Sequence, residues 1–375
     1  LARFPFNPQK KTLKDTIYRS FFVVGTQGSG KTTAAKYLFQ ALTGYEELPP
    51  EKRPAIIILD GEMGENSFKQ FTPEHKMKSK TRKFLSDHNI SPAFVKVHSI
   101  SGKAGDGDTT LGLDGLEYDD IPLFFENLQE KTENVLKQKL KLCFEEFKKF
   151  GKDKTLSEIR DTILGYIRTD PEVYAIQRPA IANALKAVEL DIFDQPNKTK
   201  ITTDLICQAG KISVIDVNGL DIRRRRMVAV FLLLLLHRFK DKEENTDPGV
   251  ILVIDEAEQI FPIKCSSSEK AYVDRIIAKT KDIADNGRKR NFGQFICTHQ
   301  AEGVDDRVVG LAETVLAFRY SGDEKWIKKQ FGKNYVDEIY NLKVGECVIR
   351  IKISDDEQKP ILTKIYFPDV SLQEN

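Results

Sequence analysis

A glycine-rich segment near the start of the sequence has the pattern of a phosphate-binding loop. The segment "GTQGSGKT" fits G-x-x-x-x-G-K-[ST], with Gly25, Gly30, Lys31 and Thr32 at the defined positions. An apolar run precedes it and a helix-forming run follows it, which is the context that this pattern requires. Glycines let successive backbone N–H groups turn inward, and the start of a helix adds partial positive charge. The segment therefore predicts a site for nucleotide phosphates; the alternative is an ordinary glycine turn before a helix.

Two side chains of this loop have expected chemical roles. We expect Lys31 to reach the β- and γ-phosphates as a point charge, and the Thr32 hydroxyl to bind Mg²⁺. The other loop residues are expected to contact the nucleotide mainly through the backbone. The predicted nucleotide-binding residues are Gly25, Thr26, Gln27, Gly28, Ser29, Gly30, Lys31, Thr32 and Thr33.

A pair of acids later in the sequence predicts the second half of such a site, which needs a carboxylate at the end of a neighbouring apolar strand. The segment "GVILVIDEAEQI" places Asp255 and Glu256 there. We expect Asp255 to bind Mg²⁺ through water and Glu256 to polarise the attacking water, so hydrolysis is expected and not binding alone. Capping of a helix is the alternative role for both. Asp216 in "SVIDVNG" is a competing metal ligand, but only Asp255 has a second carboxylate beside it.

The elements that must position these residues form an alternating pattern. Short apolar runs of the kind found in strands buried on both faces are separated by helical segments, for example 31–42, 223–240 and 270–286. This alternation predicts an α/β fold with a mostly parallel central sheet covered on both sides. The strand-like runs end at Gly25, Asp60, His98, Val217, Asp255, His299 and Tyr320.

Two regions depart from the alternation and suggest the domain organisation. Residues 101–205 lack sheet-like runs and are rich in Lys and Glu, which predicts a helical subdomain inserted into the α/β core. The core would then consist of residues 1–100, with the phosphate loop, and residues 206–375, with the acidic strand. The segment "GECVIRIKISDDEQKPILTKIYFPDV" predicts a C-terminal antiparallel hairpin.

Composition limits the possible partners. The net charge is only +2, from 58 basic and 56 acidic residues, so whole-protein charge does not argue for nucleic-acid binding. The run "RRRR", Arg223 to Arg226, is interpreted as a solvated helix face or, alternatively, as a phosphate or nucleic-acid contact. No N-K-x-D sequence for reading guanine is present, which favours ATP.

Cysteine usage and hydropathy bear on the location of the protein. The five cysteines include no C-x-x-C pair, which favours a reducing intracellular setting without a zinc site. The apolar run from Met227 to Leu236 is shorter than the roughly 20 residues that a membrane-spanning helix needs, so a buried helix is expected. Because the sequence begins at Leu1, an upstream domain or anchor could have been removed. We therefore expect a cytoplasmic protein, at the inner face of the membrane if such an anchor exists.

The order of several segments resembles that of a known superfamily. The series "GTQGSGKTT", "AIIILDGEMGE", "VILVIDEAEQIF" and "GQFICTHQ" with the downstream "VLAFRY" is similar to the HerA/FtsK superfamily of ring ATPases, and to HerA-like members in particular. The resemblance covers nearly the whole chain outside the helical insertion. It implies a RecA-like P-loop NTPase that binds ATP and Mg²⁺ and forms a homo-hexamer. Such proteins pump double-stranded DNA or, in the conjugation and secretion branch, move DNA or protein across a membrane.

The resemblance also implies roles for individual residues. Gln300 would sense the γ-phosphate or orient water. Arg288 is the first candidate, and Arg290 the second, for an arginine that acts in the site of a neighbouring subunit. Arg319 occupies another position where such proteins place a catalytic or interfacial arginine. Glu62 or Glu65 is expected near the nucleotide, with a solvated loop as an equal alternative.

Two departures from the family pattern leave the cargo open. The few residues before the phosphate-loop strand imply that the small N-terminal barrel of HerA-like proteins is absent or removed. The long insertion is similar to the helical domain of conjugation ATPases. A DNA translocase is the favoured function, with a membrane-associated conjugation or secretion ATPase as the alternative and a nucleotide-binding regulator as a third. A membrane channel or a nuclease is the kind of further partner that these functions imply.

Overall fold

The fold comes from a computed structural model of the 375-residue chain. It describes residues 17–46, 48–61, 67–69, 79–87, 89–100, 107–113, 115–125, 128–150, 155–171, 173–187, 190–241, 247–353, 356–357 and 359–364. All statements below concern these residues.

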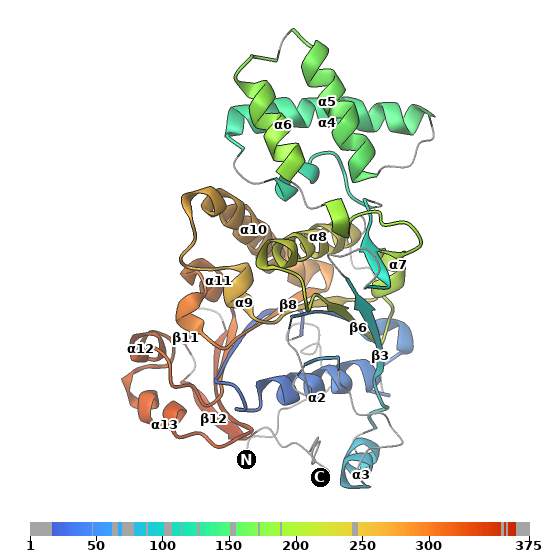
Figure 1. The fold of residues 1–375 in the computed structure, drawn as a ribbon. Helices are drawn as coiled ribbons and strands as arrows, with labels where there is room; N and C mark the ends of the chain where they lie inside the picture. The colour runs from blue at the N-terminus through green and yellow to red at the C-terminus, as the bar shows by residue number, and fades with distance from the viewer. Residues whose placement is uncertain are drawn as a thin grey trace.

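A single large sheet forms the centre of the molecule (Figure 1). Seven of its strands are parallel to their neighbours. In spatial order these are β9 (Thr314–Ala317), β1 (Ser20–Val24), β8 (Phe292–Thr298), β7 (Val250–Ile254), β2 (Ala55–Asp60), β6 (Lys211–Asp216) and β3 (Phe94–Ser99). Antiparallel strands extend the sheet beyond β9; they are β10 (Glu346–Ile353), β11 (Asp356–Glu357) and β12 (Ile361–Lys364). The predicted α/β fold, with a mostly parallel sheet and an antiparallel C-terminal part, is confirmed.

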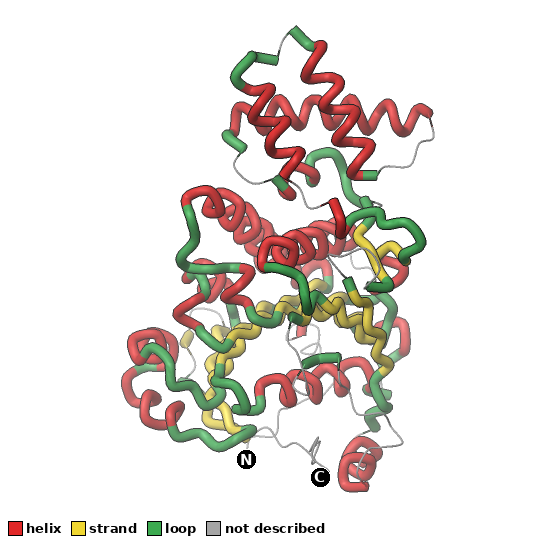
Figure 2. Tube along the Cα trace, in the orientation of Figure 1, coloured by secondary structure: helices red, strands yellow, loops and turns green. Residues whose placement is uncertain are grey.

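The central strands are apolar on both faces because helices cover both faces (Figure 2). In β1, Phe22 and Val24 pack into one hydrophobic core, whereas Phe21 and Val23 pack into the other. Figure 1 places helix α2 on the second face, with α8 and α10 on the first. Their bounds are Lys31–Gly44 for α2, Ile222–Asp241 for α8 and Ser267–Asn286 for α10.

The apolar run within α8 is buried, as predicted. Every residue from Met227 to Leu236 is at most 3% exposed. Burying each leucine of this run contributes about 2 kcal/mol, so α8 is a major source of stability for its face of the sheet. Among the described residues, no helix combines the length and apolar character that crossing a bilayer requires.

One strand differs from the prediction that all are buried on both faces. In β3 the side chains alternate between exposed and half-buried, and Phe94 is 58% exposed. The reason is its position: β3 pairs only with β6 and ends the sheet, so its outer side has no covering strand. His98 is the exception, since it is buried at the inner end of the strand.

Three helices form a separate group between residues 130 and 187, at the top of Figure 1. They are α4 (Glu130–Phe150), α5 (Leu156–Thr169) and α6 (Gln177–Ala187). The group is joined to the core through two short parallel strands, β4 (Thr109–Leu111) and β5 (Thr199–Ile201). Sequence reading found no strand in this region, because runs of three residues are too short to show a period of two.

Arginines from the core helices bind the segment that leads into this group. Arg238 of α8 donates to Asp120 at 2.9 Å and to Asp119 at 2.6 Å. Arg275 of α10 donates to the carbonyl of Phe125 at 2.7 Å and to Glu133, in the first turn of α4, at 3.2 Å. The base of the helical group is therefore held to α8 and α10 by charge-assisted hydrogen bonds.

The remaining described elements are short. The α-helices are α3 (Ser79–Asp87), α7 (Thr203–Ile206), α9 (Ala257–Ile260), α11 (Asp306–Leu311), α12 (Glu324–Phe331) and α13 (Val336–Tyr340). The 3-10 turns are η1 (Pro50–Lys52), η3 (Ile121–Phe124), η4 (Leu190–Ile192), η5 (Gly287–Arg290), η6 (Ala301–Gly303) and η7 (Lys333–Tyr335).

Candidate nucleotide site

The carboxyl ends of the parallel strands share one edge of the sheet, which is where open α/β sheets bind ligands. The phosphate loop follows β1, the acid pair follows β7, and the segment with Gln300 follows β8. The strand order β1-β8-β7 puts the acidic strand one strand further away than the neighbouring position that the sequence suggested. It also puts Gln300 between the loop and the acids.

The glycines of the loop are required by close contacts and by backbone conformation. A Cβ on Gly25 would lie 2.7 Å from Ser29 Oγ and 2.8 Å from Phe318 Cβ. Gly28 and Gly30 have φ angles of 72° and 100°, which side chains rarely allow. A larger residue at these positions would distort the loop.

Segments from late in the chain hold the loop in place. The backbone N–H and the hydroxyl of Thr26 both donate to the carbonyl of Arg319, at 2.8 Å and 3.0 Å. The N–H of Gly345 donates to the carbonyl of Ser29 at 3.2 Å. Arg319 therefore lies at the loop of its own chain, with its side chain exposed. Gln27 and Thr33 are exposed and half-buried, respectively.

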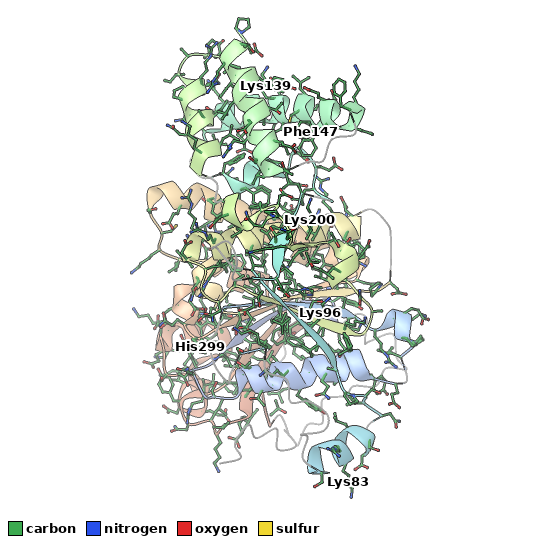
Figure 3. All side chains as sticks on the ribbon, turned by 45° about the vertical axis from the view of Figure 1, so that its right-hand side comes forward. Lys83, Lys96, Lys139, Phe147, Lys200 and His299 are labelled. Atoms are coloured by element: carbon green, nitrogen blue, oxygen red, sulfur yellow. The ribbon has the colours of Figure 1, made fainter. Side chains whose placement is uncertain are left out.

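Lys31 is buried inside the loop and bonds to groups that a phosphate could replace. Its ammonium donates to the carbonyls of Gly25, at 2.5 Å, and Thr26, at 3.3 Å. It also lies 2.9 Å from Nδ1 of His299, which is labelled near the start of α2 in Figure 3. Because an ammonium only donates, Nδ1 is the acceptor in this contact. Sequence reading did not assign a role to this histidine.

The loop fits a nucleotide triphosphate. Lys31 is only 5% exposed, and its ammonium contacts two carbonyl oxygens and a ring nitrogen, which are positions that phosphate oxygens could take. Ser29 Oγ is buried and has no hydrogen-bond partner among the described residues. Thr32 begins the helix beside Lys31, and Asp255 is 5% exposed at the end of β7. Among the described residues, no group of three or more His, Cys, Asp or Glu side chains could hold a metal ion.

The two acids after β7 have different surroundings. Asp255 Oδ1 accepts a hydrogen bond from the N–H of Glu256 at 3.0 Å. Glu256 has a left-handed backbone, with φ 51° and ψ 48°, at the start of α9. Its Oε2 accepts from Arg225 Nη1 at 3.1 Å and from Gln259 Nε2 at 2.9 Å. Arg225 is a site residue that sequence reading did not single out within its basic run.

The other arginines of that run also bind groups of this chain. Arg224 pairs with Asp191 of η4 at 3.1 Å, and Arg226 pairs with Glu269 of α10 at 2.6 Å. Arg226 is only 6% exposed. The predicted solvated face is therefore wrong for Arg226. Arg224, Arg225 and Arg226 each contact a carboxylate of this chain.

Gln300 is exposed beside the loop. Its backbone N–H donates to the Thr298 hydroxyl at 3.0 Å, and this hydroxyl donates to Glu258 Oε2 at 2.6 Å. The turn that carries Gln300 is thus tied to α9, which follows the acid pair.

Arg288 and Arg290 lie at the amino end of β8, on the opposite edge of the sheet. Arg288 pairs with Glu313 at 2.6 Å, and Arg290 pairs with Asp241 at 2.5 Å. The seven residues of β8 separate them from the phosphate loop by about 23 Å. At this distance neither arginine reaches the phosphate loop of its own chain.

Asp216, the competing acid, lies further from the phosphate loop than Asp255 does. Asp216 ends β6, which lies two strands further from the phosphate loop than β7 does. Its carboxylate pairs with Lys69 at 3.0 Å. A lysine already neutralises this carboxylate. Glu62 and Glu65 lie outside the described residues.

Comparison with known proteins agrees with this geometry. Residues 12–236, more than half of the chain, match the family model of the helicase HerA central domain. The chain belongs to this family. No curated protein matches the sequence.

Solved structures show the same fold. VirB4 of Thermoanaerobacter pseudethanolicus is 16% identical, with a TM-score of 0.56 over 93% of this chain and 89% of that chain. The bacterial conjugative coupling protein TrwBdeltaN70 is 11% identical, with a TM-score of 0.60 over 94% and 87%. TrwB in complex with the non-hydrolysable ATP analogue ADPNP is 10% identical, with a TM-score of 0.58 over 94% and 86%. These likenesses show the fold, and the family match makes the chain a P-loop NTPase of the HerA type.

Proposed function

We propose that this HerA-family chain hydrolyses ATP and works as a homo-hexameric ring motor that translocates double-stranded DNA. The observation that carries the proposal is the meeting of three groups at one edge of the sheet: the phosphate loop with Lys31, the acid pair Asp255 and Glu256, and Gln300. Each comes from a different parallel strand, and each supplies a different part of phosphoryl transfer to water.

The residues have separate tasks in this reaction. Lys31 exchanges its carbonyl and histidine contacts for phosphate oxygens, which lowers the cost of the charge that develops there. Thr32 and Asp255 would hold Mg²⁺, and a bound Mg²⁺ neutralises phosphate charge. Glu256 accepts the proton of the attacking water, while the Gln300 amide orients that water.

The choice of ATP rests on the absence of a guanine-reading sequence. TrwB has been solved with both ADPNP and GDPNP, so the fold itself does not select the base. Competition between ATP and GTP in a turnover assay measures this choice directly. Equal kcat/KM values for the two nucleotides would contradict it.

The ring part of the proposal is supported by the arginines on the opposite edge. Arg288 is 47% exposed and cannot reach its own phosphate loop, whereas Arg319 is exposed beside that loop. In a closed ring, one edge of each subunit can face the loop of the next. Hexamers in sedimentation experiments with ADPNP and Mg²⁺ are expected; monomers under all nucleotide conditions would contradict the ring.

DNA-dependent turnover tests the cargo. We expect double-stranded DNA to raise ATP turnover, and the stimulation to fall with salt because phosphate contacts release counterions. The control is the Lys31→Ala variant, which should show no turnover with or without DNA. Turnover that ignores DNA at low salt would contradict a DNA translocase.

A membrane-associated conjugation or secretion ATPase is the second candidate function. The observation that favours it is the inserted group α4 to α6, together with a likeness to VirB4 and TrwB that covers 93% and 94% of the chain. This candidate predicts turnover that is stimulated by a channel protein and not by DNA alone.

A further inference from the structure

The carboxylate of Glu256 is enclosed by a ring of hydrogen bonds. Arg225 Nη1 donates to Glu256 Oε2 at 3.1 Å and to Gln259 Oε1 at 2.9 Å. Gln259 Nε2 donates back to the same Glu256 oxygen at 2.9 Å. The three side chains therefore restrain one another, and Oε2 already has two donors.

The same contacts draw the carboxylate toward β2. A Cβ on Gly61, the residue after β2, would lie 3.0 Å from Glu256 Oε2 and 2.7 Å from Arg225 Nη1. In the strand order, β2 flanks β7 on one side, whereas β8 and β1 lie on the other. The phosphate-loop strand is two strand spacings from β7, or about 10 Å. The carboxylate thus lies on the side of its strand that faces away from the loop.

The pair is built to hold its position. Arg225 and Glu256 are 17% and 22% exposed, so water screens their attraction only partly. Arg225 Nε also donates to the carbonyl of Leu220 at 3.0 Å, which fixes the guanidinium at the start of α8. The left-handed backbone of Glu256 turns its side chain into this contact.

The geometry points to Arg225 as a positioning residue that withdraws Glu256 from the reaction until nucleotide is bound. This inference rests on the proposed ATPase function. A carboxylate that accepts two hydrogen bonds, one from a guanidinium, is a poor acceptor for the proton of a water. Glu256 must therefore leave Arg225 and turn toward β8 before it can act on water at the phosphates.

A double-mutant cycle tests the pair without any turnover. The variants are Arg225→Ala, Glu256→Ala and the double variant, with thermal unfolding as the measurement. Without nucleotide, each single change is expected to lower Tm by about 2 °C and the double variant by little more. With ADPNP and Mg²⁺, the two shifts should become additive. Additive shifts without nucleotide, or coupling that nucleotide leaves unchanged, would overturn the inference.

Single-turnover hydrolysis tests the consequence. At ATP concentrations well below saturation, Arg225→Ala is expected to raise the rate about fivefold, because nucleotide binding then no longer has to break an ion pair of ordinary strength. Arg225→Lys should lie between the two. Arg224→Ala is the matched control. It removes the same charge from the same helix, but Arg224 contacts Asp191 and Asp221 and not Glu256. An Arg225→Ala variant that unfolds normally but hydrolyses no faster than the wild-type chain would overturn the inference.

The two tests separate this inference from the proposed function. If neither the wild-type chain nor any variant hydrolyses ATP, the proposed function fails. The cycle in the absence and presence of ADPNP still decides whether Arg225 holds Glu256 and whether nucleotide releases it.

Discussion

Lys31, at the carboxyl edge of the sheet, differs in its partners from the charged side chains at the amino edge and along the core helices. Its ammonium contacts two carbonyls and a histidine ring nitrogen, which a phosphate can replace. Elsewhere, charges join two elements; these pairs are Arg238–Asp120, Arg226–Glu269 and Arg288–Glu313, here called the fastening pairs. Groups with replaceable partners are suited to chemistry, whereas groups that join elements are suited to stability.

Of the substitutions at the carboxyl edge, Lys31→Ala should lower ATP hydrolysis the most. It removes the only positive charge placed inside the loop, so we expect kcat/KM for ATP to fall about a thousandfold. Nucleotide affinity, measured by calorimetry, should fall with it. The matched control is Lys69→Ala, which removes a lysine from Asp216 at the same edge. A comparable loss in Lys69→Ala would mean that Asp216, not Asp255, belongs to the site.

Glu256→Gln should separate binding from chemistry. An amide cannot take a proton from water, so turnover is expected to fall several hundredfold while nucleotide still binds. The measurement is phosphate release beside an equilibrium binding assay. Asp216→Asn is the control and should retain turnover. If Glu256→Gln hydrolyses at the normal rate, the acid pair has no part in the reaction.

Arg288→Ala sharpens the comparison because Arg288 belongs to a fastening pair and is also the expected trans-acting arginine. If it acts in a neighbouring site, turnover should fall about a hundredfold. Rings mixed from Arg288→Ala and Glu256→Gln subunits should recover part of the activity, since some interfaces then contain both intact groups.

Arg290→Ala is the control for this experiment, since its partner is Asp241. If mixed rings recover activity with Arg290→Ala subunits and not with Arg288→Ala subunits, Arg290 is the trans-acting arginine and Arg288 is not. If both variants have a lower Tm but full activity, Arg288 and Arg290 stabilise the fold and take no part in the reaction.

The sequence predicted those parts of the fold that depend on a pattern within one short segment. The phosphate loop depends on spacing within one short segment, and the buried strands depend on uninterrupted apolar runs. Strand β3 was predicted to be too buried, because the exposed Phe94 and Lys96 fit an edge strand only after the strand order is known. The order also decided that β8, not β7, lies beside β1.

The parts of the site that the sequence did not predict depend on distant partners. His299 contacts Lys31 across 268 positions, and Arg225 contacts Glu256 across 31. Nothing within "RRRR" distinguishes Arg225 from Arg226, although one contacts the acid pair and the other binds the start of α10. Tertiary packing alone assigns these arginines their different roles.

Arg226–Glu269, a fastening pair next to Arg225 on α8, should give the smallest effect. Ser266 and Arg226 donate to Glu269 and lower the pKa of its carboxyl to about 2, below the ordinary value of 4.5. Because this pKa is lowered on folding, the stabilisation is fully present above about pH 4.5 and is lost as the pH falls toward 2. After allowing for its partial exposure, we expect about 1 kcal/mol.

Denaturant unfolding of the wild-type chain and of Glu269→Gln measures this difference. The difference should be largest at pH 7 and shrink toward zero as the pH approaches 2, while ATP turnover at pH 7 stays unchanged. A stability difference that does not depend on pH would mean that packing, not charge, is what Glu269 contributes. A loss of turnover would instead mean that the fastening pairs on α8 are coupled to the acid pair, and that the separation between the two kinds of charge does not hold on this helix.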